Sequence, residues 1–251
     1  MVRRASRPAL HCDPARLRAE RGRPLILGHR GLPGALVENR VEGFLAALAA
    51  GADGVELDVQ LAADGVPVVI HDSGLERTTG RPGRVADVGS GELARLGVPR
   101  LETVLDVLPT EAVLNVEIKD FTPRDRGLER SVVALVKVRK AEGRVLFSSF
   151  NPLALARLRR LDPALYAAQL TAPGYLRALR LGYLRRPNAV HPHLSELTPA
   201  RLAAWRRRGR RVIAWGADTE KGLAEALAWD LDGIITDRPA EAVRLAVGPP
   251  G

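Results

Sequence analysis

Apolar runs of strand length alternate with helical patterns along almost the whole chain. Eight such runs predict strands, at 24–28, 54–59, 112–119, 144–150, 165–170, 188–192, 211–216 and 231–237. Helical patterns are predicted at about 39–50, 101–108, 126–141, 152–160, 173–184, 198–209, 219–228 and 238–246. This alternation indicates an α/β protein with a parallel sheet and helical crossovers. Eight units predict a (β/α)8 TIM barrel, and a doubly wound open sheet is the main alternative.

Several helix starts carry clear sequence signals. Asn151-Pro152, Thr198-Pro199 and Arg238-Pro239 each place a proline in a first turn, where its missing N–H costs nothing. Asn39 is predicted to cap the helix at 39–50, with Glu42 three residues later completing a capping box. Residues 1–23 are expected to form an N-terminal appendage with one short helix at 14–21. Residues 24–251 are expected to form a single barrel domain.

A ninth strand candidate, at 66–70, does not fit the alternation. It follows the strand at 54–60 too closely for a helical crossover, so the two should form an antiparallel hairpin. Asp64-Gly65 predicts a two-residue turn that places His71 opposite Asp58, and a turn shifted by one step places it opposite Glu56. Residues 73–100 then form a loop-rich insertion that can cover the barrel mouth.

The strand ends carry the polar side chains that suggest chemistry. Glu56 and Asp58 are two residues apart on a strand, so they share a face, and Glu117 and Lys119 repeat that spacing with Asn115 below them. Converging carboxylates repel one another unless a divalent cation neutralises them, and oxygen ligands suit Mg²⁺ or Ca²⁺. The alternative is that these acids only form ion pairs with cationic side chains.

Two histidines lie at the same predicted barrel mouth. His29 follows the first strand and His71 ends the hairpin, so they suit a general acid and a general base. Arg30 and Lys119 are the cations expected to contact phosphate oxygens, and Trp215 can form an apolar wall for the substrate. A second pair, His191 and His193, is a weaker candidate for metal binding because no carboxylate motif accompanies it.

Composition narrows the function classes. The net charge is +9, and arginine supplies nearly all 38 cations, since lysine occurs only at 119, 137, 140 and 221. The run 206–211 is expected to be a solvated helix end, and no aromatic platform or nucleic-acid-binding motif accompanies it. The single cysteine, Cys12, suits a reducing cytosol. We read neither a signal peptide nor a membrane span, so a cytoplasmic protein is expected.

The combined motifs resemble the glycerophosphodiester phosphodiesterase (GDPD) family. The resemblance runs in order through about residues 25–240. Its blocks are His29-Arg30-Gly31, Glu38-Asn39, Glu56-Leu57-Asp58-Val59, Asp64-Gly65, Val68-Val69-Ile70-His71-Asp72, Leu75 with Arg77-Thr78-Thr79, Asn115-Val116-Glu117-Ile118-Lys119, Ser149-Phe150, Trp215 and Asp232-Gly233-Ile234-Ile235-Thr236-Asp237. It departs from the family's usual sequence at Val37, at Arg40 and in Gly216-Ala217-Asp218 after the tryptophan.

The resemblance implies a phospholipase C-like phosphodiesterase TIM barrel. It also implies hydrolysis of glycerophosphodiesters to sn-glycerol 3-phosphate and an alcohol with a divalent metal. Residue by residue, Glu56, Asp58 and Glu117 match the family's metal ligands, and His29 and His71 match its catalytic histidines. Arg30 and Lys119 match its substrate-phosphate contacts.

Two other functions remain open from the sequence. One is a lysophospholipase D-type lipid phosphodiesterase, which needs an apolar groove. The other is a non-enzymatic barrel that binds an anion or nucleic acid through its arginines without needing a metal. The residues do not indicate the oligomeric state, the head-group preference or which histidine is the acid.

Overall fold

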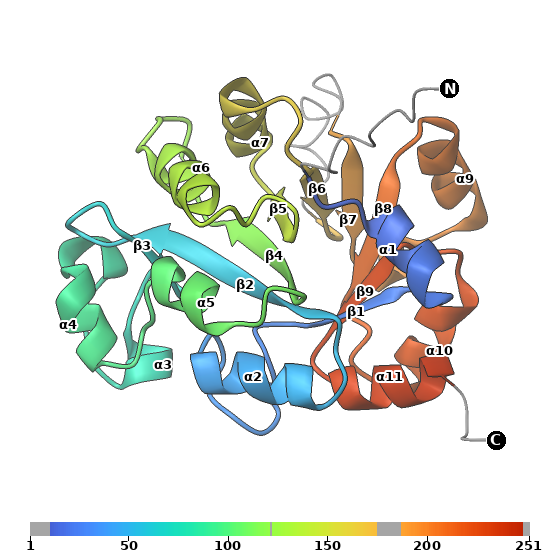
Figure 1. The fold of residues 1–251 in the computed structure, drawn as a ribbon, viewed down its shortest axis with the longest axis horizontal. Coiled ribbons are helices and arrows are strands. Elements are labelled where there is room, and N and C mark those ends of the chain that lie inside the picture. The colour runs from blue at the N-terminus through green and yellow to red at the C-terminus, as the bar shows by residue number, and fades with distance from the viewer. Residues whose placement is uncertain (1–10, 121, 175–186, 248–251) are drawn as a thin grey trace, which may run out of the picture.

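The computed structural model of this protein describes residues 11–120, 122–174 and 187–247. Those residues contain a single nine-stranded sheet (Figure 1). Its strands are β1 Leu25–Gly28, β2 Gly54–Leu61, β3 Pro67–Val69, β4 Val113–Ile118, β5 Val145–Ser149, β6 Ala167–Thr171, β7 Ala189–Pro192, β8 Arg211–Trp215 and β9 Gly233–Thr236. All eight strands predicted to alternate with helices are present, each within a few residues of its expected bounds.

The eight parallel strands close into a barrel. β1 pairs with β2, Leu27 opposite Gly54, and also with β9, Leu25 opposite Gly233. The remaining parallel pairs follow chain order from β2 through β4 to β9. Closure through β1 confirms the (β/α)8 barrel and rules out the open doubly wound sheet, which would leave two edges unpaired. A side chain at Gly54 would approach the Val113 carbonyl oxygen to 1.9 Å, so this junction requires glycine.

Helices cover the outside of the barrel (Figure 1). They are α2 Val41–Ala49, α5 Leu101–Val107, α6 Leu128–Val138, α7 Pro152–Leu161, α9 Pro199–Arg207, α10 Glu220–Ala228 and α11 Pro239–Val247. The predicted first-turn prolines are confirmed, because α7, α9 and α11 each begin at a proline. In two of these helices the preceding side chain is also a cap, since Asn151 accepts the Leu153 N–H and Thr198 accepts the Arg201 N–H. The helix predicted at 173–184 lies, apart from its first two residues, outside the described ranges.

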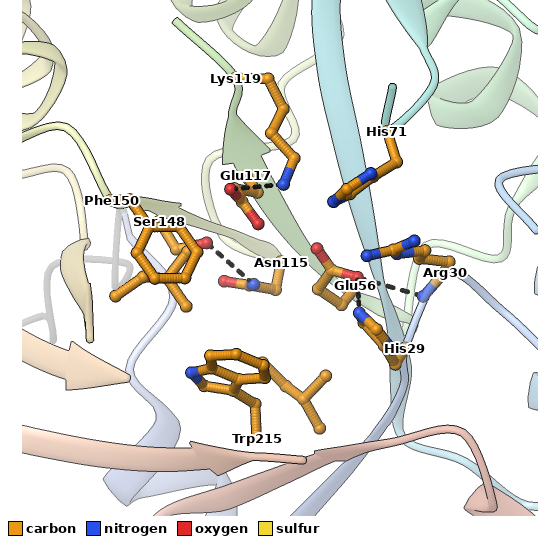
Figure 2. Close-up of a pocket in the computed structure, with 12 residues that line it drawn as sticks. His29, Arg30, Glu56, His71, Asn115, Glu117, Lys119, Ser148, Phe150 and Trp215 are labelled. Carbon is orange, nitrogen blue, oxygen red and sulfur yellow. Dashed lines mark hydrogen bonds and ion pairs between the residues drawn. The ribbon is translucent and has the colours of Figure 1, made fainter. Parts of the chain in front are cut away.

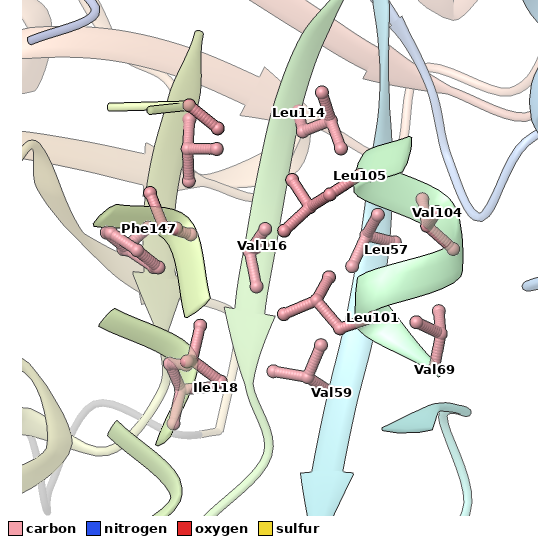
Figure 3. Packing of buried hydrophobic residues seen from close by; sticks show 14 of the residues in the cluster. Leu57, Val59, Val69, Leu101, Val104, Leu105, Leu114, Val116, Ile118 and Phe147 are labelled. Carbon is pink, nitrogen blue, oxygen red and sulfur yellow. The ribbon is translucent and has the colours of Figure 1, made fainter. Parts of the chain in front are cut away.

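Alternate strand residues form the layer between barrel and helices. Leu57 on β2 is fully buried and packs in one cluster with Leu101 and Leu105 of α5 (Figure 3). Burying each such side chain contributes about 1.5–3 kcal/mol. Because neighbouring residues on a strand point to opposite faces, the outward Leu57 leaves Glu56 and Asp58 on the inward face. The apolar pattern therefore orients the acids.

The half of the barrel interior nearer the N-terminal ends of the strands is apolar. Its cluster comprises Leu27, Val113, Leu146, Tyr166, Ala168, Ala189, Ile213 and Ile235. Cys12 and Leu17 of the N-terminal segment join this cluster, and α1 Pro14–Arg21 has the bounds expected from sequence. The segment therefore packs against the N-terminal end of the barrel. Its separation from the barrel as an appendage at residue 23 stays a prediction.

The hairpin is present, but both predicted registers were wrong. Val59 pairs with Val69, and Leu61 pairs with Pro67. The Ala62 N–H donates to the Val66 carbonyl, while Gly65 has a φ of +75°. Three residues, 63–65, therefore form the turn instead of two, because glycine in the left-handed region allows the longer connection. Continued along the chain, this register places His71 level with Leu57, between Glu56 and Asp58.

The predicted insertion at 73–100 is a packed layer over the hairpin. It contains α3 Glu76–Thr79, the 3₁₀ helix η1 Val85–Asp87 and α4 Ser90–Arg95. Its own apolar cluster comprises Ala62, Val68, Ile70, Leu75, Val85, Leu93 and Val98. This cluster holds the segment after His71 against the rim of the barrel.

The arginine run at 206–211 is only partly a solvated helix end. Arg206 donates to Asp232 at 2.8 Å, and Arg211 donates to Asp13 at 2.9 Å. Arg210 is buried, whereas Arg207 and Arg208 are exposed. Several of these arginines therefore hold the N-terminal end of the barrel together. In the described part of the chain, no helix is long and apolar enough to cross a membrane.

Candidate active site

The predicted site residues meet at the C-terminal end of the barrel strands. His29 follows β1, Glu56 lies on β2 and Glu117 lies on β4. They line a cavity of about 110 Å³ (Figure 2). The same cavity is lined by the other predicted contacts, Arg30, His71, Lys119 and Trp215. Asp58 does not line it, but it is buried directly opposite Glu117 in the parallel pairing of β2 and β4.

Three carboxylates form the centre of the site. One oxygen from each of Glu56, Asp58 and Glu117 lies within 4.8 Å of the others, and all three side chains are buried. Asn115, also predicted to point inward, lines the cavity and donates to the Ser148 hydroxyl at 3.1 Å. A buried set of three carboxylates fits a hard divalent cation such as Mg²⁺ or Ca²⁺. The arrangement is therefore able to hold the metal ion that the sequence predicts.

Two cations face these acids. The Lys119 ammonium lies 2.8 Å from Glu117 and 3.1 Å from Asp58. The Arg30 Nε lies 3.4 Å from Asp58, while its backbone N–H donates to Glu56 at 3.1 Å. The ion pairs considered as an alternative thus exist, but two cations do not neutralise three carboxylates. Glu56 also faces the titratable His29, whose Nε2 lies 3.9 Å away, so one negative charge remains for a further cation whenever this histidine is neutral.

The pKa values of the acids reflect this imbalance. Burial raises the pKa of Glu56 to about 8, and the charge of Asp58 adds to the effect. Burial also raises the pKa of Glu117 to about 7, although the Lys119 charge opposes the rise. Burial acts on Asp58 in the same direction, but the charges of Lys119 and Arg30 outweigh it and lower its pKa. Without a metal ion, Glu56 and Glu117 are destabilised as carboxylates.

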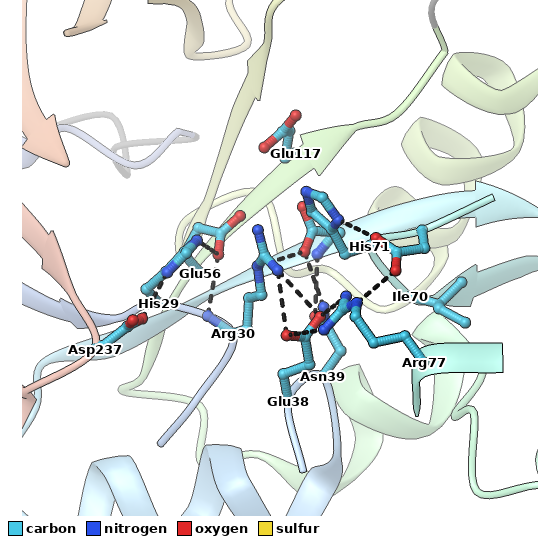
Figure 4. Close-up of polar contacts among 12 residues, drawn as sticks. His29, Arg30, Glu38, Asn39, Glu56, Ile70, His71, Arg77, Glu117 and Asp237 are labelled. Carbon is cyan, nitrogen blue, oxygen red and sulfur yellow. Dashed lines mark hydrogen bonds and ion pairs between the residues drawn. The ribbon is translucent and has the colours of Figure 1, made fainter. Parts of the chain in front are cut away.

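His29 is held between two acids. Its Nδ1 lies 2.7 Å from Asp237, which follows β9, and its Nε2 lies 3.9 Å from Glu56 (Figure 4). The bond to Asp237 orients the ring and leaves Nε2 towards the cavity. Burial lowers the pKa of His29, but the Asp237 bond and the Glu56 charge outweigh it and raise the pKa to about 9.

His71 has a different environment. Its Nδ1 lies 2.7 Å from Asp72, which in turn accepts a hydrogen bond from Arg77 at 2.5 Å. Burial lowers the pKa of His71, and the positive charge of Lys119 lowers it further, against the opposing charge of Asp58. The Gln60 side chain donates to the carbonyls of residues 70, 71 and 72 at 2.8–3.1 Å. The strand therefore anchors the backbone that carries this histidine.

A chain of ion pairs connects the two sides of the site. Arg77 donates to both oxygens of Glu38, at 2.7 and 2.8 Å, and Arg30 donates to the same carboxylate at 3.1 Å (Figure 4). Glu38 thus joins Arg30 to the Arg77–Asp72–His71 series. Glu38, Asp72, Arg77 and Asp237 stand in the recognised motifs, but sequence reasoning assigned them no role.

Asn39 was wrongly predicted to be a helix cap. The residue before α2 is Arg40, and Asn39 is buried with a φ of +56°. Its amide donates to Asp58 at 2.8 Å and its oxygen accepts the Asp58 N–H at 3.2 Å. Asparagine tolerates the left-handed conformation, which turns its side chain towards β2 instead of the helix. The Glu38-Asn39 motif was the available signal.

Trp215 lies across the cavity from the acids, as predicted for an apolar wall. Its ring meets Phe150 edge to face, with centroids 6.0 Å apart, and its indole N–H donates to the Thr171 carbonyl at 3.2 Å (Figure 2). The two rings leave an apolar surface opposite the charged one.

The other predicted histidine pair does not assemble as a metal site. His191 is buried beside the Tyr166 hydroxyl, 3.1 Å away, and burial lowers its pKa to about 3. His193 instead contacts the Ser195 hydroxyl at 2.7 Å and packs edge to face on Trp215. Among the described residues, the candidate metal site with at least three His, Cys, Asp or Glu ligands is the set of carboxylates at the barrel mouth.

Comparison with known proteins finds relatives of this chain. The profile of the family described as "Glycerophosphoryl diester phosphodiesterase family" matches residues 29–241. A glycerophosphodiester phosphodiesterase of Bacillus altitudinis is 33% identical over 244 residues, covering 88% of this chain and 97% of that protein. One from Caldanaerobacter subterraneus is 29% identical over 235 residues, with the same coverage.

Solved structures agree with these sequence matches. The glycerophosphodiester phosphodiesterase of Thermotoga maritima superposes with a TM-score of 0.75 at 27% identity, covering 88% of this chain and 98% of that chain. A phosphodiesterase of Oleispira antarctica, solved in complex with the product sn-glycerol-3-phosphate, has a TM-score of 0.73 at 25% identity. That match covers 91% of this chain and 98% of that chain.

Proposed function

Because the chain belongs to the glycerophosphoryl diester phosphodiesterase family, we propose that it hydrolyses glycerophosphodiesters to sn-glycerol 3-phosphate and an alcohol. The match to the relatives that carry this name extends over nearly their whole length. The observation that carries the proposal is the buried carboxylate set with a histidine on either side of it. That combination suits a phosphodiester, which needs charge neutralisation and two proton transfers.

Glu56, Asp58 and Glu117 would hold a divalent cation, Mg²⁺ or Ca²⁺. Their oxygen-only donor set and their excess negative charge support this role. Such an ion supplies neutralisation of the phosphate charge and activation of an oxygen nucleophile. Arg30 and Lys119 would contact the phosphate oxygens, with Arg30 offering a planar fork and Lys119 a compact charge. Trp215 would form the apolar wall beside the substrate's carbon chain.

The two histidines would move the protons. His29 lies between Asp237 and Glu56, whereas His71 faces the Lys119 ammonium as well as Asp58. The negative surroundings favour a proton on His29, so His29 would protonate the leaving alkoxide and His71 would deprotonate the nucleophile. The nucleophile is either water, which yields the product directly, or the glycerol 2-hydroxyl, which first yields a cyclic phosphate that water then opens.

The test is an assay of purified protein on glycerophosphocholine, with EDTA and then with each metal added back. We expect glycerol 3-phosphate to appear only with metal, and phosphorus NMR would detect a cyclic phosphate if the 2-hydroxyl attacks. Full activity in EDTA would contradict the metal assignment. Lysophosphatidylcholine tests the lysophospholipase D-type alternative, which we do not favour because charged and polar side chains dominate the groove beside the site.

A further inference from the structure

A second, larger groove adjoins the cavity at the barrel mouth. It has a volume of about 640 Å³ and shares His71 and Lys119 with that cavity. Its walls come from the insertion after the hairpin and from the loop between β4 and α6. Apart from Gln60 near the end of β2, these walls lie outside the eight-stranded barrel, so the groove is formed mainly by the segments at its rim.

The cavity at the barrel mouth and the groove differ in the size of ligand that each can hold. The cavity of about 110 Å³ is lined by Glu56, Glu117 and both histidines, but it is smaller than the roughly 300–1,000 Å³ typical of ligand pockets. A diester with a phosphate at the carboxylates must therefore extend beyond it. The groove begins at His71 and Lys119, which makes it the continuation available to the alcohol portion of the substrate.

The acids that line the groove are already engaged. Asp72 binds His71 and Arg77, and Glu76 accepts the Gly83 N–H at 3.0 Å. Asp120 accepts bonds from Thr122 and Arg157. Two of the groove cations, Lys119 and Arg77, are likewise engaged in ion pairs with acids.

Two arginines in the groove differ from these residues. Arg84 begins the turn that leads into η1, and Arg126 lies in the loop before α6. Both are exposed, and neither guanidinium has a hydrogen bond or ion pair to another residue in the described parts of the chain. They approach the same groove from two segments that lie more than 40 residues apart in the sequence. The groove thus presents two uncommitted guanidinium groups.

We propose that this groove binds the alcohol portion of the substrate and that Arg84 and Arg126 select alcohols carrying an anionic group. The inference rests on the proposed hydrolase function. The shared chemistry of such substrates is a phosphate or carboxylate on the alcohol, which a guanidinium binds through paired charge-assisted hydrogen bonds. These residues bind and position the leaving alcohol, while proton transfer stays with the histidines.

Matched substrates test this proposal. Glycerophosphoinositol 4-phosphate differs from glycerophosphoinositol by one phosphate, and glycerophosphoserine differs from glycerophosphoethanolamine by one carboxylate. The ratio of kcat/KM within each pair measures selection of the anionic group. We expect the wild-type ratio to favour the anionic member by about fivefold to tenfold in at least one pair, and to fall as salt screens the exposed charges.

Four single variants separate the groove from general surface charge. Arg84→Gln and Arg126→Gln should each reduce the ratio, and the double variant should bring it close to one. Arg95→Gln, on the same insertion, and Arg124→Gln, in the same loop as Arg126, change exposed arginines that do not line the groove, so they should leave the ratio unchanged. The two control variants, Arg95→Gln and Arg124→Gln, should also keep wild-type activity on glycerophosphoethanolamine.

Binding gives a readout that does not depend on turnover. Calorimetric titration in EDTA should show glycerophosphoinositol 4-phosphate binding more tightly than glycerophosphoinositol to wild type, but not to the Arg84/Arg126 double variant. A ratio of one in wild type, or an unchanged ratio in the double variant, would overturn the groove assignment while leaving the hydrolase function intact. Absence of hydrolysis of every diester would instead refute the hydrolase function, and the titration would still decide the groove.

Discussion

The two ends of the barrel both bury charged side chains, but they pair them differently. At the N-terminal end, Asp53 accepts hydrogen bonds from Arg21 at 2.8 Å and Arg23 at 2.6 Å, and it also accepts the Ile26 N–H at 2.8 Å. At the same end, Asp232 accepts from Arg206 and from a backbone N–H. Each acid there is satisfied by cations and amides.

At the C-terminal end the acids lie against one another. Glu56, Asp58 and Glu117 share two cations, and burial raises the pKa values of Glu56 and Glu117. Barrels of this kind place catalysis at the C-terminal end and stability at the other. The difference teaches that completed pairing marks the structural end, whereas unbalanced charge marks the end that we propose receives a cation and an anionic substrate.

The largest expected effect is at the unbalanced end. Glu56→Gln removes one proposed metal ligand, so kcat/KM should fall by about a thousandfold or more and Ca²⁺ or Mg²⁺ affinity should fall in calorimetric titration. The matched control is Glu225→Gln, which changes an exposed acid of α10 that does not line the cavity or the groove. Unchanged metal binding in Glu56→Gln would contradict the ligand assignment.

The histidines come next. His29→Ala and His71→Ala should each reduce kcat by about 10²–10⁴-fold while metal affinity stays nearly the same, because each removes one proton transfer. His11→Ala serves as the control, since His11 lies beside Asp162, away from the cavity. Near-normal turnover in either variant would remove that histidine from the mechanism.

The structural end should respond in the opposite way. Asp53→Ala leaves two arginines and the Ile26 N–H without their partner, so the free energy of unfolding should fall by about 3 kcal/mol in urea titration. Activity per folded molecule should be retained. The pair of the exposed Asp106 with Arg139 provides the comparison, and Asp106→Ala should lower the free energy of unfolding far less than Asp53→Ala does. Equal losses of stability in Asp53→Ala and Asp106→Ala would show that burial does not make the Asp53 pairs more stabilising than the Asp106 pair.

Arg77 tests how the insertion supports the site. Arg77→Ala removes the partner of Asp72 and Glu38, so His71 and Arg30 lose their common support and kcat should fall by about 10–100-fold. Arg77→Lys should recover part of this loss, because it retains the charge without the paired hydrogen bonds. Arg81→Ala, which breaks a pair with Glu92 on the same insertion, should leave kcat unchanged.

The last expected effect is a pH dependence of stability without metal. The folded-state pKa of Glu56 is raised from 4.5 to about 8, so the folded protein binds its proton more tightly than the unfolded chain does. Stability in EDTA should therefore fall as pH rises from about 4.5 to 8, measured as Tm. Glu56→Gln should flatten this slope, and so should an added divalent cation. A Tm that rises through this window in wild type and not in Glu56→Gln would contradict the charge imbalance.

Local repetition determined much of this protein in advance. The alternation of strands and helices predicted the barrel, and spacing by two placed Glu56 with Asp58 and Glu117 with Lys119 on inward faces. These features depend on neighbours in the chain, so the sequence contains them directly. The helix at 14–21 was predicted with its observed bounds for the same reason.

Only the tertiary structure decided which distant groups meet. The three-residue turn put His71 between the predicted registers, a left-handed backbone turned Asn39 onto Asp58, and barrel closure brought Asp237 to His29 across 208 positions. The groove with Arg84 and Arg126 likewise joins two separate loops. Strand and helix periods specify which face a residue occupies, but contacts between faces follow from packing of the whole chain, which no local pattern encodes.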